Sequence, residues 1–169
     1  CGRVESILEV FPDARFVVLY RNPCETIPSL LKLLSAGWKH HGNIDADKVR
    51  DSLRAMTVLS YETYLYPLQA LARHPGTRQA VVDYRELVAE PMQTVEKIYA
   101  DLGLTMTQAF RDGLRREQDK ARRHETEHRY TLAEFGLDDA EIRRTLAPLF
   151  ERFQWDDGEA RGAGPVEAS

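Results

Sequence analysis

The sequence has little cysteine, little net charge and no long apolar segment. Its 169 residues include only two cysteines, which is too few for a disulfide framework. The formal net charge of −4 provides no overall attraction to nucleic acid or to an anionic membrane. No apolar run approaches the roughly 20 residues that a membrane-spanning helix needs. We therefore expect no nucleic-acid partner and no membrane segment in this chain.

What is present indicates one globular α/β domain. Hydrophobic residues make up 43% of the chain and charged residues 30%, enough for a single core. Two apolar segments, 15–20 and 78–84, read as strands, and the helix between them predicts that they are parallel neighbours. We expect a partial parallel sheet flanked by helices. The pattern of apolar residues and caps predicts those helices at 2–11, 23–35, 45–73, 91–102, 107–123 and 139–153.

The junction after the first strand has the chemistry of a phosphate site. Val17, Val18 and Leu19 form a run that is typical of a strand buried on both faces. Asn22 is a good N-cap, and Pro23 suits the first position of a helix. Arg21 therefore precedes a helix N-terminus, which favours anions, and its planar guanidinium suits phosphate.

Later in the same predicted helix, Pro28 and Ser29 can each be interpreted in two ways. Ser29 follows Arg21 by eight residues and can add a hydroxyl donor. Pro28 interrupts the helix, so it either kinks the axis and aims Ser29, or makes a tight packing contact. The plainer interpretation of Arg21 and Ser29 is a solvated surface arginine and an inert helical serine.

Three segments, in order, resemble PAPS-dependent sulfotransferases, which use 3′-phosphoadenosine 5′-phosphosulfate as the sulfuryl donor. The run 11–31, from Phe-Pro-Asp-Ala-Arg to Ile-Pro-Ser-Leu-Leu, resembles the family's 3′-phosphate-binding segment. The run 81–91 resembles its next strand and helix, and 128–137 resembles a C-terminal loop near the nucleotide.

The resemblance implies a fold, an activity and a set of site residues. The fold would be the P-loop nucleotide-kinase-like sulfotransferase fold, and the reaction would transfer a sulfuryl group from PAPS to an acceptor, most often a hydroxyl, without a metal. Arg21 and Ser29 would hold the 3′-phosphate, and Tyr84 would lie against the adenine. The nucleotide-side loop would supply Arg123, His128 and Tyr130. The acceptor, whether a small molecule, a glycan or a lipid, depends on surface loops and is left open.

Two features of that family have no match in this sequence. One is the 5′-phosphosulfate loop with its Lys and its Thr or Ser; the other is a catalytic His or Glu that precedes the 3′-phosphate segment. The chain begins with Cys1, directly in a helix-like pattern. We expect residues 1–155 to be the C-terminal part of one sulfotransferase domain, with no catalytic residue in this chain and a disordered tail at 156–169. We favour a cytoplasmic location, although a truncated chain reveals little about its compartment.

Two other classes of protein remain as alternatives. His124-Glu125-Thr126-Glu127-His128 matches the H-E-x-x-H pattern of zinc metallohydrolases. The surrounding Arg122, Arg123 and Arg129 are typical of a solvated helix end, which argues against zinc. The second alternative is a non-catalytic interaction domain that keeps the fold without the nucleotide.

Overall fold

A computed structural model of the chain describes residues 3–40, 45–121 and 132–155. In this part, two strands form a parallel sheet, β1 (Phe16–Tyr20) and β2 (Gln79–Asp83), with Phe16 opposite Gln79 and Tyr20 opposite Asp83. The prediction of two parallel neighbours is confirmed. Because both strands run the same way and end in register, the residues that follow Tyr20 and Asp83 meet at one edge of the sheet.

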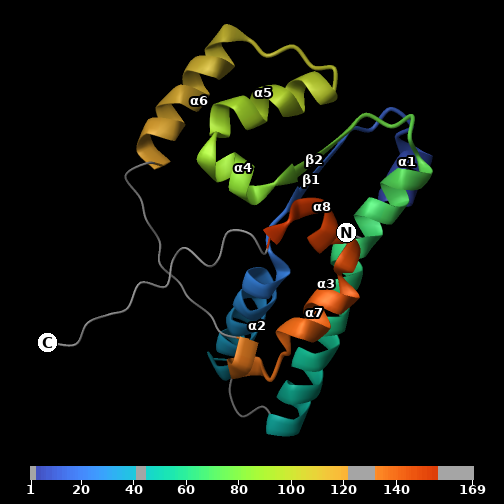
Figure 1. Ribbon diagram of the computed structural model, residues 1–169, viewed down its shortest axis with the longest axis vertical. Helices are drawn as coiled ribbons and strands as arrows, with labels where there is room; N and C mark the ends of the chain where they lie inside the picture. The colour runs from blue at the N-terminus through green and yellow to red at the C-terminus, as the bar shows by residue number, and fades with distance from the viewer. Residues whose placement is uncertain (1–2, 41–44, 122–131, 156–169) are drawn as a thin grey trace, which may run out of the picture.

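Helices lie around this sheet in two groups (Figure 1). The first group contains α1 (Val4–Val10), α2 (Pro23–His40), α3 (Ala46–Arg73), α7 (Asp139–Thr145) and α8 (Ala147–Phe153). The second contains α4 (Tyr84–Ala89), α5 (Pro91–Asp101) and α6 (Gln108–Ala121). A 3₁₀ helix, η1 (Leu132–Phe135), precedes α7 and contacts α2.

The main core joins β1 and α2, near the start of the chain, to the C-terminal helices. Side chains from β1, α2, α7 and α8 form it, and α3 packs against it. Its buried members are Tyr20, Ile27, Leu31, Ile142, Leu146, Leu149, Phe150 and Trp155. A smaller cluster of Ala80, Val82 and Leu102 holds β2 against α4 and α5.

The expectation that the first strand is buried on both faces is wrong. Val17 is 51% exposed and Leu19 48%, whereas the alternate residues Phe16, Val18 and Tyr20 face the helices. The physical reason is that α4 and α5 cover β2 but do not reach over β1 on that face. β1 therefore has one buried face and one open apolar face.

Helix boundaries agree with the sequence where a cap marks them. The Asn22 side chain accepts a hydrogen bond from Cys24 N at 3.0 Å, so Asn22 caps α2 as predicted. Asp45, predicted as the first residue of the next helix, accepts from Asp47 N at 2.8 Å and caps α3. Gly103 adopts φ +62°, the left-handed cap expected after α5. Pro28 is fully buried, which favours the packing interpretation of that residue.

Three helices differ from prediction. α2 continues to His40 rather than ending near Ser35, because one internal Gly costs a helix only about 1 kcal/mol. The predicted 139–153 helix divides at Leu146 into α7 and α8, since a proline occupies the first turn of α8. α4, a helix of six residues, has no pattern of its own in the sequence, and only the family resemblance of 81–91 implied a helix there.

Among the described residues, no helix is both long enough and apolar enough to span a membrane.

Candidate functional site

The parallel strands bring Arg21 and Tyr84 together. Each residue directly follows the end of its strand, at the edge where open α/β sheets bind ligands. The Arg21 guanidinium carbon lies 5.0 Å from the centre of the Tyr84 ring, within the range of a cation–π contact. The two sequence-predicted nucleotide contacts that come from different strands are therefore neighbours.

A cavity of about 430 Å³ opens beside this pair. One part of its wall is polar and includes Arg21, Glu25 and Arg85, and another is apolar and includes Val88 and Ala89. Asn22, Tyr84 and Trp155 complete the lining. A volume of this size lies within the range of about 300–1,000 Å³ that is usual for small-molecule sites.

Glu25 holds the Arg21 side chain in place. Its Oε2 atom accepts from Arg21 Nε at 2.8 Å and lies 2.6 Å from Nη2. Both side chains are nearly half exposed, at 49% and 45%, so water and salt weaken the pair. Sequence reasoning missed Glu25, although its spacing of four residues from Arg21 is the helical signal for such a pair.

A second arginine, Arg85, is held by a buried carboxylate. Asp83 accepts hydrogen bonds from Arg85 Nε at 3.0 Å and from Nη2 at 2.8 Å, and also from the Arg85 backbone N–H at 2.8 Å. Arg85 also donates to the backbone carbonyls of Phe153 and Gln154 at the end of α8. Asp83 thus caps α4 and fixes Arg85 in the cavity wall.

Ser29 is not among the residues that line this cavity. It is half-buried on α2, nearly two turns from the start of the helix. Glu25 and Ser29 are four residues apart on α2 and lie on one side of the helix, whereas Arg21 precedes the helix and contacts Glu25 through its ion pair. Arg123, His128 and Tyr130 lie outside the described residues, as does the 124–128 zinc pattern.

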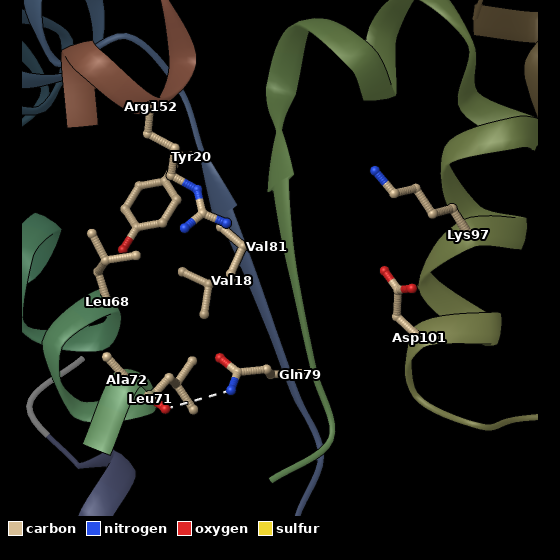
Figure 2. Close-up of a pocket in the computed structure, with 10 residues that line it drawn as sticks. All are labelled: Val18, Tyr20, Leu68, Leu71, Ala72, Gln79, Val81, Lys97, Asp101 and Arg152. Carbon is tan, nitrogen blue, oxygen red and sulfur yellow. Dashed lines mark hydrogen bonds between the residues drawn. The ribbon is translucent and has the colours of Figure 1, made fainter. Parts of the chain in front are cut away.

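A larger cavity, of about 470 Å³, lies between the sheet and α3, and none of the predicted site residues lines it. Val18, Tyr20, Gln79 and Val81 from the strands line it, with Leu71 and other residues of α3 (Figure 2). Lys97 and Asp101 of α5 and Arg152 of α8 stand at its margins (Figure 2). Its lining includes neither Arg21 nor Tyr84, the residues that directly follow the two strands, so we favour the smaller cavity as the functional site.

No metal centre accompanies either cavity in the part of the chain that the structure describes. No three side chains of His, Cys, Asp or Glu gather there as they do around a metal ion.

Comparison with known proteins relates the chain to a protein family. A family model described as "Sulfotransferase family" matches residues 1–108, which include both strand ends. Two curated relatives, from Mycobacterium bovis and Mycobacterium tuberculosis, are named omega-hydroxy-beta-dihydromenaquinone-9 sulfotransferase. Each is 29% identical over 103 residues, covering 60% of this chain. The aligned part is 26% of each relative, so the match spans about a quarter of their length. No solved structure matches.

Proposed function

Because the chain belongs to the sulfotransferase family, we propose that its cavity at the strand ends binds the nucleotide of the sulfuryl donor PAPS. The observation that carries the proposal is the meeting of Arg21 and Tyr84 at 5.0 Å. A permanently charged fork beside an aromatic ring and an apolar wall suits a phosphorylated adenosine.

Each residue of the site has a binding role in this proposal. Arg21 binds the 3′-phosphate, and Ser29 adds a hydroxyl donor further along α2. Tyr84 packs against the adenine, with Val88 beside it in the cavity wall. Arg123, His128 and Tyr130 are proposed to contact the nucleotide from the C-terminal side.

The proposed reaction transfers a sulfuryl group from PAPS to an acceptor hydroxyl, leaving adenosine 3′,5′-bisphosphate. When bound, PAPS supplies the sulfuryl group, and the residues of this chain bind and orient its nucleotide. We assign no catalytic base to this chain and no metal to the reaction. The names of the matched relatives describe a hydroxylated acceptor, which supports a hydroxyl as the acceptor group here.

Thermal unfolding with adenosine 3′,5′-bisphosphate tests the proposal. A ligand at about 100 times its dissociation constant adds roughly 2.7 kcal/mol to the free energy of unfolding, so we expect a clear rise in melting temperature. Adenosine 5′-phosphate (AMP), which lacks the 3′-phosphate, should have a smaller effect. The Arg21→Ala variant should lose the difference between the two nucleotides.

Arg15→Ala is the matched control, because Arg15 is an exposed arginine just before the start of β1, at the opposite end of the strand. It should respond to both nucleotides as the wild type does. A bisphosphate response that survives in Arg21→Ala, or that disappears equally in Arg15→Ala, would contradict the assignment.

A further inference from the structure

A tyrosine from α3 bonds directly to the backbone that carries Arg21. The Tyr64 hydroxyl donates to the Arg21 carbonyl oxygen at 2.9 Å. It also shares a short hydrogen bond with the Thr26 hydroxyl, which lies 3.2 Å from the Asn22 carbonyl oxygen. The Tyr64 hydroxyl, from 43 residues away, thus engages the Arg21 carbonyl, and the single Thr26 proton goes either to Tyr64 or to the Asn22 carbonyl.

Tyr64 is itself held firmly. The Tyr20 hydroxyl donates to the Tyr64 carbonyl oxygen at 2.9 Å, and the two rings stack with their centres 6.0 Å apart. Burial raises the pKa of Tyr64 to about 12, against the opposing effect of the Thr26 hydrogen bond. The hydroxyl therefore keeps its proton at neutral pH and remains a donor to the Arg21 carbonyl.

We propose that Tyr64 is a positioning residue for 3′-phosphate recognition, an inference that rests on the proposed function of Arg21. The hydrogen bond fixes the peptide plane between Arg21 and Asn22. That plane sets the direction in which the Arg21 side chain leaves the strand and the orientation of the first turn of α2. A pre-set guanidinium loses less conformational freedom when it binds an anion.

Calorimetric titration with adenosine 3′,5′-bisphosphate and with AMP separates this role from a purely structural one. In Tyr64→Phe, we expect the dissociation constant for the bisphosphate to rise about fivefold, the equivalent of about 1 kcal/mol for ordering one side chain on binding. The dissociation constant for AMP should stay within about twofold of the wild-type value, because AMP has no 3′-phosphate for Arg21 to bind.

Tyr66→Phe is the control on the same helix. It removes a hydroxyl two residues away, which donates to Glu5 at 3.3 Å and not to the junction. Both dissociation constants should be unchanged in this variant. A loss of stability alone would weaken the binding of both nucleotides equally, so the ratio of the two dissociation constants is the decisive readout.

Three other results would overturn this inference, and they have different consequences for the proposed function. If the wild type prefers the bisphosphate and Arg21→Ala abolishes that preference while Tyr64→Phe retains it, the inference fails and the proposed function stands. An equal loss for both nucleotides in Tyr64→Phe also overturns the inference. If the wild type shows no preference for the bisphosphate, the proposed function and this inference fall together.

Discussion

At the scale of single residues, the candidate site centres on Arg21, whose guanidinium contacts both Glu25 and Tyr84. Glu25 holds its guanidinium through Oε2, and Tyr84 lies beneath it at 5.0 Å. Ser29 continues the same helical side beyond Glu25. A phosphate that binds the Arg21 guanidinium would compete for it with the Glu25 carboxylate, because Glu25 Oε2 already accepts a hydrogen bond from Arg21 Nε.

Glu25→Gln should bind adenosine 3′,5′-bisphosphate more tightly than the wild type. Because the ion pair is nearly half exposed, we expect a modest gain of about threefold in affinity at low salt, which should shrink at high salt. Calorimetric titration at two salt concentrations measures both effects.

Asp47→Asn is the control for Glu25→Gln. This variant also removes one negative charge from an ion pair, because Asp47 Oδ1 lies 3.0 Å from Arg50 Nη2. Asp47 is at the start of α3 and does not line the cavity. The affinity of this variant should match the wild type. If Glu25→Gln instead weakened bisphosphate binding, Glu25 would be orienting Arg21 and not competing for it.

At the scale of helices and strands, one buried carboxylate connects three elements around the cavity. Asp83 ends β2, caps α4 and holds Arg85, which in turn donates to the carbonyls at the end of α8. Asp83 is only 4% exposed, so its buried side-chain oxygens would lack partners without these hydrogen bonds.

Asp83→Ala should lower the free energy of unfolding by about 2 kcal/mol, because it removes a helix cap and also leaves Arg85 without its buried partner. Urea denaturation measures the change. Asp138→Ala removes only an exposed cap, at the start of α7, and should cost about 1 kcal/mol. Equal costs for the two variants would show that the Arg85 contacts contribute nothing to stability.

Local chemistry explains which elements the sequence predicts. Asn22, Asp45 and Gly103 mark helix ends through interactions with near neighbours, so a sequence pattern contains the signal. The exposure of Val17 and Leu19 depends on which helices reach over β1, and this is a property of tertiary packing.

The same distinction applies to the candidate site. The meeting of Arg21 and Tyr84 follows from two parallel strands that end side by side, and the sequence predicts both strands. The bond from Tyr64 to the Arg21 carbonyl joins residues 43 apart through the packing of α3. No local pattern contains that contact.

At the scale of the whole molecule, the C-terminal helices complete the core beneath the site. Ile142, Leu146 and Leu149 are fully buried against side chains of β1 and α2, although they lie beyond the family-matched residues 1–108. The stability of the strand–helix junction therefore depends on the far end of the described chain.

Leu149→Ala should lower the free energy of unfolding by about 3 kcal/mol, because it leaves a cavity in this core. Leu33→Ala removes the same atoms from a side chain that is 71% exposed on α2, and should change stability by less than about 0.5 kcal/mol. Denaturant unfolding of both variants tests the comparison. A small effect of Leu149→Ala would mean that α7 and α8 do not stabilise the rest of the molecule.

The proposed binding of a 3′-phosphate by Arg21 is tested by removing the Arg21 side chain and, separately, the 3′-phosphate of the ligand. The dissociation constants of adenosine 3′,5′-bisphosphate and AMP are measured for the wild type and for Arg21→Ala. We predict that the wild type prefers the bisphosphate by at least about tenfold, and that the variant binds both nucleotides equally, since hydrogen bonds to charged groups contribute about 1.5–3 kcal/mol. The same preference in both proteins would contradict the account.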